Sequence, residues 1–405
     1  MKVVHICTSL EGGAGICAKR IVNATRALGI DARVLVAKGN RQDYVDVIKP
    51  IYPWSKVWPI QKIQVLMNIL GKWPKTVVLK KRISKELRNN QGTFTSPITD
   101  YTNMASHPWV QDADIIHLHW IGNFVDYESF FKNVKKPIVW TIHDENPGLG
   151  GFHYTLWKDK ATDNLRRLDD DFCGLKKQAY NSINSMTLVA ISTMMKEFFS
   201  SNKLLSRFPS VIIHNGIFAD DFTPISADCA RQALSINNKK KVFLFISQDI
   251  HEDRKGLKAL IDALEIIKYP NTLLICLGKF KSIPDTLFEI RCEGFVENNR
   301  LQSLYYSAAN YYIMPSYQEA FAQTPLEAMA CGTPVVSFPC SGASDLINSE
   351  NGVVCDDFTV EALVKGIKSA MSRGYSRDTI RKDLINRFSY DKIANQYIEL
   401  YKKVI

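Results

Sequence analysis

Two glutamates lie eight positions apart late in the chain, at Glu319 and Glu327. The apolar run Tyr311–Met314 predicts a buried strand that ends at Pro315, and residues 324–330 predict a helix with a proline in its first turn. We therefore expect Glu319 in the strand-to-helix loop and Glu327 on the helix. In an open α/β sheet, ligands bind beyond the carboxyl ends of the strands, where amides at a helix N-terminus suit an anion such as a diphosphate. Contact with sugar or ribose hydroxyls would explain two acids beside such a site.

A pair of cations precedes a second predicted helix. Arg254 and Lys255 follow the predicted strand 241–246 and come just before a helix that begins near Gly256. The helix dipole disfavours cations at this position unless an anion lies between them and the backbone. Arg254 and Lys255 are therefore candidate ligands of a diphosphate, whose negative charge they could neutralise without a metal. A solvated basic turn is the alternative.

Histidines gather at predicted strand ends in the first half of the chain, at positions 117, 119, 143 and 153. An isolated histidine is more often structural than catalytic. His143 differs because it leaves a buried strand and is followed by two acids and a loop-forming proline. Metal binding is the competing interpretation, but the sequence has no HxxxH or HExxH spacing on a helix to support it.

The glycine-rich loop after the first strand formally matches GxGxxA, from Gly13 to Ala18. A nicotinamide-binding site would also need an acid at the end of the second strand, where the chain has Ala37, Lys38 and Gly39 instead. The other use of such a loop is to let a phosphate or an acceptor approach the backbone closely.

Length and composition limit the class of protein. A chain of 405 residues with 46% apolar and 23% charged residues is expected to form two globular domains. The N-terminus lacks the apolar core of a signal peptide, and no run of residues has the length and apolarity of a membrane span. Nine scattered cysteines without CxxC spacing indicate reduced thiols in a cytoplasmic protein.

The net charge of +10 is concentrated between Trp54 and Arg88. Nine basic residues there face the single acid Glu86 and are interleaved with Trp54, Trp58, Trp73 and aliphatic residues. This pattern fits a surface that rests on anionic lipid head groups or receives an anionic acceptor. The alternative is a solvated helical hairpin whose apolar side packs on its own domain. No nucleic-acid-binding motif accompanies the charge.

Predicted strands and helices alternate in two sets. We expect an α/β protein with two doubly wound, Rossmann-like domains that face each other across a cleft. The expected parts are a first domain at 1–219, a second domain at 220–377, and a helical segment at 378–405 that returns to the first domain. The boundary is set by the turn-rich passage 215–224.

Together these residues resemble the retaining glycosyltransferases of family 4, which have the two-domain GT-B fold. The resemblance covers nearly the whole chain, and the pair Glu319 and Glu327 is its most specific part. Weaker elements are the glycine loop, His143, Asn215-Gly216-Ile217, Lys255-Gly256, Gly294-Phe295-Val296, Pro315-Ser316 and Asn351-Gly352. Residues 141–144 and 150–154 resemble a branch that builds bacterial exopolysaccharide and capsule.

The resemblance implies that the domain at 1–219 is the acceptor side and that the domain at 220–377 binds the nucleotide sugar. It also implies roles for individual residues. Lys255, Arg254 and Gly13 would bind the donor diphosphate, and Glu327 the ribose. Glu319 would bind the donor sugar and act in catalysis with His143. The remaining contacts implied are sugar and phosphate contacts of Ala320, Phe321, Ala322, Gln323 and Thr324, and base contacts of Gly294, Phe295 and Val296.

The activity implied is transfer of a hexose from a UDP- or GDP-linked sugar to a glycan or lipid-linked saccharide, as in exopolysaccharide, capsule or lipopolysaccharide synthesis. The resemblance implies no metal or other cofactor. The cysteines indicate a cytoplasmic protein, and the basic segment 54–88 is the basis for the hypothesis that it is peripheral on the inner face of the cytoplasmic membrane. Alternatives are a sugar-nucleotide epimerase or hydrolase on the same fold, or a non-catalytic sugar-nucleotide-binding subunit. The chain departs from the family pattern at Ser247-Gln248, where arginine is common, at Ala320 and Ala322, where glycine is common, and by having only Cys173 after the histidine motif.

Overall fold

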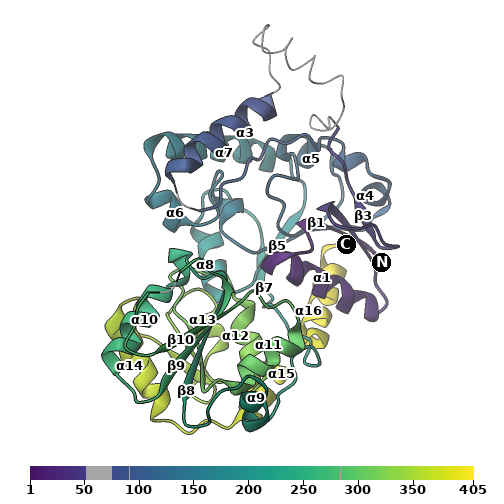
Figure 1. Ribbon diagram of the computed structural model, residues 1–405. Coiled ribbons are helices and arrows are strands. Elements are labelled where there is room, and N and C mark those ends of the chain that lie inside the picture. Colours follow the sequence, from purple (N-terminus) through teal and green to yellow (C-terminus); the bar gives the residue numbers. More distant parts are fainter. Residues whose placement is uncertain (52–74, 91, 283) are drawn as a thin grey trace. The chain divides into compact units, whose positions relative to one another are not determined.

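A computed structural model describes the chain except for residues 52–74, 91 and 283. The described residues form two compact units, each with its own parallel sheet (Figure 1). Unit 1 comprises Met1–Ile191, Met195–Ile213 and Ala394–Ile405, and unit 2 comprises Ser192–Met194 and His214–Ile393.

The sheet of unit 1 has seven strands in the order β3-β2-β1-β4-β5-β6-β7, and all neighbours are parallel. Its central strands are almost entirely buried, because helices cover both faces of a parallel sheet. The strands are β1 (Lys2–Ser9), β2 (Asp31–Lys38), β3 (Val45–Val47), β4 (Ile115–Leu118), β5 (Ile138–Ile142), β6 (Met186–Ala190) and β7 (Ser210–Ile212).

Helices connect these strands, as in other doubly wound sheets (Figure 1). They are α1 (Gly12–Ala27), α3 (Lys75–Glu86), α4 (Pro108–Asp112), α5 (Tyr127–Asn133), α6 (Thr155–Asp159), α7 (Asp163–Tyr180) and α8 (Thr193–Ser201).

The sheet of unit 2 has six parallel strands in the order β10-β9-β8-β11-β12-β13. Its strands are β8 (Lys241–Asp249), β9 (Thr272–Lys279), β10 (Glu289–Gly294), β11 (Tyr311–Met314), β12 (Val335–Ser337) and β13 (Gly352–Val354). Its helices are α9 (Ala227–Ala233), α10 (Leu257–Ile267), α11 (Asn299–Ala308), α12 (Gln323–Ala330), α13 (Ala343–Leu346), α14 (Val360–Met371) and α15 (Arg377–Phe388).

Both sheets are wound outward in two directions from a central pair of strands. In unit 1 the chain runs from β1 out to β3 and returns to β4 beside β1; in unit 2 it runs from β8 out to β10 and returns to β11 beside β8. Loops diverge above such a pair, which leaves a crevice at the carboxyl ends of the strands. The prediction of two doubly wound α/β domains is confirmed. β11 has the predicted bounds, and α12 begins at Gln323, one residue before the predicted start.

The C-terminal segment expected at 378–405 divides between the units. α15 belongs to unit 2, where Arg381 donates to the carbonyls of Phe222 and Ala330. α16 (Tyr390–Val404) begins in unit 2, and from Ala394 onward the chain belongs to unit 1. There Tyr401 and Tyr397 reach the buried polar groups of β4 and β5.

Most of the predicted basic segment lies outside the described residues, including Trp54, Trp58 and Trp73. Its described part includes α3, whose buried Ile83 packs in a cluster with Phe152, Leu165 and Phe172. Lys80, Lys81, Arg82 and Lys85 are exposed on the same helix. Across the described residues, no helix has the length and apolarity needed to cross a membrane.

Candidate functional site

In unit 2, Glu319 pairs with both predicted cations, Arg254 and Lys255. Nη1 of Arg254 lies 2.9 Å from Oε1 of Glu319, and Nζ of Lys255 lies 2.5 Å from the same oxygen. Arg254 also donates to the carbonyl of Gln318 at 2.5 Å and to Oε1 of Glu252 at 2.8 Å. Glu319 is thus joined to two cations that lie 65 and 64 positions earlier in the chain, in one charged cluster at the β8/β11 crevice.

A close backbone contact fixes the loop that carries these cations. Arg254 and Lys255 form a short 3-10 helix (Asp253–Lys255), which ends at Gly256 with φ of +74°. A Cβ at Gly256 would lie 1.9 Å from the carbonyl oxygen of Pro315, so only glycine fits between the two loops. The amide of Tyr317 donates to the carbonyl of Arg254 at 2.8 Å. The loop after β8 and the loop after β11 are therefore held against each other.

The cations keep Glu319 ionised although it is buried. Burial by itself would raise the pKa of the Glu319 carboxyl, but the charges and hydrogen bonds of Lys255 and Arg254 outweigh it and lower the pKa to about 2. The Lys255 side chain is 21% exposed, against 9% for Arg254. Lys255 is therefore the more accessible of the two to an incoming anion.

Glu327 has a different partner. It lies on α12, is buried, and its Oε2 accepts a hydrogen bond of 3.0 Å from the hydroxyl of Tyr306 on α11. Burial raises the pKa of the Tyr306 hydroxyl well above its ordinary value, which keeps it a donor. Tyr306 was not among the predicted site residues, because a tyrosine on a partly apolar helix carries no sequence signal for this contact.

The segment between the two glutamates is tightly packed at its start and more open near α12. Ala320 and Phe321 are buried, and the carbonyl of Phe321 accepts from Asn215 at 3.3 Å. Ala322, Gln323 and Thr324 are half-buried at the helix start. The Thr324 hydroxyl accepts from the hydroxyl of Tyr312 on β11 at 2.6 Å, which ties the first turn of α12 to the strand.

The predicted base-binding residues lie elsewhere on the same sheet. Gly294 ends β10 with φ of +78°, Phe295 is 54% exposed, and the Val296 carbonyl accepts from Gln302 at 2.6 Å. β10 is the edge strand, separated from β11 by β9 and β8. The structure therefore does not bring these residues into the Glu319 cluster but places them at the carboxyl end of the same sheet.

The remaining predicted residues belong to unit 1. Gly13 lies in the first turn of α1, exposed and with no atom within 4 Å of an added Cβ. A Cβ at Gly15 would meet the carbonyl oxygen of Ser9 at 2.5 Å, so this glycine serves the packing of α1 on β1.

His143 follows β5 and is half-buried, with its Nε2 3.3 Å from Nδ1 of His119. Burial lowers the pKa of the His143 imidazole to about 4, against a smaller opposing effect of Asp144. His143 is therefore neutral at neutral pH. It can offer or accept a hydrogen bond without carrying a charge.

His153 and Asp144 form a separate buried pair. Nδ1 of His153 lies 2.6 Å from Oδ2 of Asp144, and the indole N–H of Trp120 donates to the same oxygen at 2.8 Å. Thr95 contacts the other nitrogen of His153 at 3.0 Å. With both nitrogens engaged, His153 has a structural role: it anchors the loop that follows His143.

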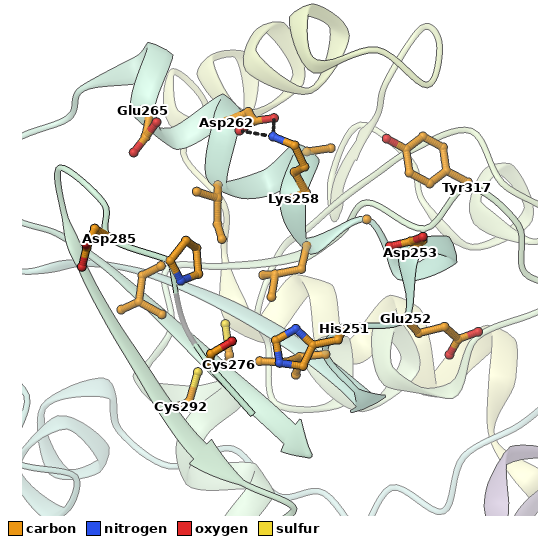
Figure 2. Close-up of a pocket in the computed structure, with 18 residues that line it drawn as sticks. His251, Glu252, Asp253, Lys258, Asp262, Glu265, Cys276, Asp285, Cys292 and Tyr317 are labelled. Atoms are coloured by element: carbon orange, nitrogen blue, oxygen red, sulfur yellow. Dashed lines mark hydrogen bonds and ion pairs between the residues drawn. The ribbon is translucent and has the colours of Figure 1, made fainter. Parts of the chain in front are cut away.

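A cavity of about 600 Å³ lies in unit 2 beside α10 (Figure 2). Ile250, Leu257, Ile261, Cys276, Ile290 and Cys292 contribute apolar lining, and Glu252, Asp253, Asp262, Glu265 and Asp285 contribute carboxylates. Ser282, Pro284 and Asp285 of the connection between β9 and β10 also line it. Lys255, Glu319 and Glu327 do not line it, but Glu252, which pairs with Arg254, does, so the cavity adjoins the charged cluster.

Comparisons with known proteins identify a matching family model and related chains. Residues 227–387 match the family model described as glycosyl transferases group 1. An uncharacterized glycosyltransferase of Methanocaldococcus jannaschii is 26% identical over 316 residues, 72% of this chain and 76% of its own length. The putative teichuronic acid biosynthesis glycosyltransferase TuaC of Bacillus subtilis is 21% identical over 98% of this chain and 95% of its own.

Two solved structures show the same fold over the full chain. Sucrose-phosphate synthase of Thermosynechococcus elongatus has a TM-score of 0.70 and 16% identity, covering 100% of this chain and 99% of its own. Anabaena HepE in complex with UDP and glucose has a TM-score of 0.66 and 17% identity, covering 99% of both chains.

Proposed function

We propose that this glycosyltransferase of the GT-B fold, whose residues 227–387 match the glycosyl transferases group 1 model, transfers a hexose with retention of configuration. The donor is a nucleotide diphosphate sugar, UDP- or GDP-linked. The acceptor is a glycan or a lipid-linked saccharide of a surface polysaccharide. The UDP and glucose bound by the HepE relative, and the teichuronic acid pathway named for TuaC, support these two choices.

The observation that carries the proposal is the shared contact of Arg254 and Lys255 with Glu319. Two cations and a buried, ionised carboxylate at a doubly wound crevice suit a ligand with a diphosphate and neighbouring hydroxyls. Lys255 and Arg254 bind the diphosphate, with Gly13 of unit 1 as a further contact. Glu319 accepts hydrogen bonds from the hexose hydroxyls beside them.

The other donor contacts lie along the same sheet. Glu327 binds the ribose hydroxyls, oriented by Tyr306. The backbone of Gly294–Val296 and the exposed ring of Phe295 bind the base. Because β10 and β11 are three strand spacings apart, about 14 Å, an extended nucleoside diphosphate is needed to reach both ends. Amides of residues 320–324 contact the sugar and phosphate.

In the reaction, the acceptor hydroxyl oxygen forms a bond to the anomeric carbon on the face from which the diphosphate leaves. The bond from that carbon to the phosphate oxygen breaks, and the acceptor proton passes to the departing phosphate. Lys255 and Arg254 stabilise the negative charge that develops there, so this route needs no metal. His143, neutral at neutral pH, hydrogen-bonds to the donor sugar.

The test is a panel of UDP- and GDP-linked hexoses incubated with the protein and with lipid-linked saccharide acceptors. Nucleotide release together with a glycosylated acceptor of retained anomeric configuration is the expected result. Release of free sugar would identify a hydrolase, an isomerised sugar would identify an epimerase, and binding without turnover would identify a non-catalytic subunit. Each of these outcomes contradicts the proposal.

A further inference from the structure

Three histidines of unit 1 form a continuous row that ends at His143. His5 lies on β1, His119 follows β4, and His143 follows β5, so the row crosses three adjacent strands. Nδ1 of His5 lies 2.9 Å from Nε2 of His119, and Nδ1 of His119 lies 3.3 Å from Nε2 of His143. His5 and His119 are fully buried.

The rings meet edge to edge and not face to face. The ring centroids of His5 and His119 are 5.2 Å apart, those of His119 and His143 are 5.5 Å apart, and the planes are inclined by 14° and 25°. Each centroid-to-centroid distance exceeds the corresponding nitrogen-to-nitrogen distance by about twice the distance from an imidazole centre to its ring nitrogen. The two centroids and the two contacting nitrogens therefore lie nearly on one line. The contacting nitrogens therefore lie nearly in both ring planes, where the lone pair of one imidazole faces the N–H of the next.

A row of neutral imidazoles can be protonated in two ways. Burial lowers the pKa of all three histidines, so each carries one ring proton at neutral pH. In the first, the Nδ1–H of His5 donates to His119 and the Nδ1–H of His119 donates to Nε2 of His143, so the proton of His143 is on Nδ1. In the second, the Nε2–H of His143 donates to His119 and the Nε2–H of His119 donates to His5, so the proton of His143 is on Nε2 and His5 carries a buried Nε2–H.

The environment of His5 distinguishes the two arrangements. Its Nε2 is buried and has no hydrogen-bond partner among the residues that the structure describes. Buried N–H groups without an acceptor are rare in folded proteins, so a buried Nε2–H on His5 without an acceptor is unfavourable. The favoured arrangement leaves a lone pair at Nε2 of His5 and directs every donor toward His143.

We propose that His119 and His5 are positioning residues that hold His143 as the neutral tautomer with its proton on Nδ1. Nε2 of His143 is then occupied by the N–H of His119, and Nδ1–H is left to donate to a ligand. This inference rests on the proposed function only for the ligand, which is a hydroxyl or ring oxygen of the donor sugar. The tautomer itself is a property of the folded chain.

Two other uses of the cluster fit less well. A metal shared by His5, His117 and His119, whose ligand atoms lie within 4.8 Å of one another, would have to displace existing bonds. Both nitrogens of His117 are engaged, by Tyr401 at 2.6 Å and Thr141 at 2.8 Å, and both of His119 are engaged by the row. A proton relay would need an exit, and the row ends at Nε2 of His5, to which no described residue hydrogen-bonds.

Nuclear magnetic resonance of the full chain, labelled with ¹⁵N in the histidine rings, measures the tautomer directly. The signal of His143 is assigned by its loss in His143→Gln, and the spectrum is recorded at neutral pH without ligand. The expected spectrum shows a protonated Nδ1 and an unprotonated Nε2. A protonated Nε2 on His143 in the unmodified protein would overturn the proposal without any further variant.

Variants of His119 test the cause. His119→Phe keeps an aromatic ring but cannot donate, so His143 should lose its fixed tautomer. His119→Asn places an amide N–H near the position of Nδ1 and should restore it. His107→Asn, outside the row and still able to cap α4, is the control and should leave the signal of His143 unchanged. An unchanged tautomer in folded His119→Phe would show that the row does not set it.

Turnover gives a second readout. His119→Phe should lower kcat about tenfold or more with little change in KM for the donor, and His119→Asn should recover most of it. Equal losses in both variants would indicate a purely structural role. If the unmodified protein releases no nucleotide with any donor, the proposed function fails, and the tautomer measurement still decides the inference.

Discussion

The ammonium of Lys255 lies 2.5 Å from Oε1 of Glu319, and this oxygen also accepts from Arg254. The carboxylate therefore pairs with two cations in the absence of substrate. It fixes both at the crevice where a diphosphate is proposed to bind.

Replacing Glu319 should reduce stability as well as activity. Glu319→Gln leaves two partly buried cations facing a neutral amide, so we expect a loss of about 3 kcal/mol in the free energy of unfolding. Chemical denaturation measures it. Glu350→Gln, an exposed glutamate in the same unit, is the control. A loss no larger than that of the control would show that the pairing contributes little.

The Glu319 carboxylate also predicts that the free energy of unfolding decreases in acid. Because its folded-state pKa of about 2 lies below the ordinary value of 4.5, its stabilising contribution is complete above pH 4.5 and is lost as the pH falls toward 2. In Glu319→Gln this part of the pH dependence should be absent. Denaturation curves between pH 5 and pH 3 test it, and identical slopes in both proteins would contradict it.

Glu327 should matter for donor affinity. Glu327→Ala removes the proposed ribose contact, and Tyr306→Phe keeps the glutamate but removes the hydrogen bond that orients it. We expect donor binding to weaken by about tenfold or more in the first variant and by a smaller factor in the second. Calorimetric titration with the nucleotide diphosphate sugar measures both. Unchanged affinity in Glu327→Ala would refute the ribose assignment.

His143 should affect turnover more than binding. His143→Ala removes the hydrogen bond proposed at the donor sugar and should lower kcat by about 100-fold, with donor affinity within a few-fold of the unmodified protein. Steady-state kinetics and calorimetry separate the two effects. Near-normal turnover would remove His143 from the site.

The buried histidines predict a loss of stability in mild acid. Burial lowers the pKa of His5 to about 3 and of His143 to about 4, and the pKa values of His117 and His119 are also well below the ordinary 6.5. The unfolded chain therefore binds more protons below pH 6.5. Stability should be full above that pH and fall on acidification by about 1.4 kcal/mol per pH unit for each histidine that must become charged.

Denaturation at pH 7.5 and at pH 5.5 measures this loss, because Glu319 contributes its own loss only below pH 4.5. His117→Asn removes one titrating ring and should flatten the dependence. Equal stability of the unmodified protein at the two pH values would contradict the prediction.

The exposed cations of α3 allow a test of membrane attachment. If the basic segment binds anionic lipid, changing Lys80, Lys81 and Arg82 to glutamine should weaken binding to vesicles of anionic phospholipid, and high salt should do the same to the unmodified protein. Vesicle sedimentation measures it. Ile83 stays in place because it packs in the core. Normal binding by the triple variant would argue against this surface.

Local pattern was enough to predict most strands, because parallel strands are continuous apolar runs. Tyr311–Met314 is the clearest case, and its loop and helix followed from Pro315 and Pro325. β10 was missed because Glu289, Arg291 and Glu293 interrupt its apolar residues, as an edge strand allows.

Partnerships across the sheet could not be predicted from pattern. Nothing near His5 in the sequence indicates that its ring meets His119, since the register of β1 and β4 decides it. Lys176 shows the same limit: on a polar helix its ammonium is fully buried and donates to the carbonyls of Asn146 and Leu149. A lysine in such a helix is ordinarily read as solvated.

The return of the chain end to unit 1 has a consequence for how the protein is made. Tyr397 hydrogen-bonds to Thr141 of β5, and Tyr401 hydrogen-bonds to His117 of β4. Both partners are buried in unit 1 and lie far earlier in the sequence. During synthesis these groups lack their partners until Tyr397 and Tyr401 have left the ribosome. The first unit to be translated is thus the last to be completed, and a chain that stops before Ala394 leaves it unfinished while unit 2 is already whole.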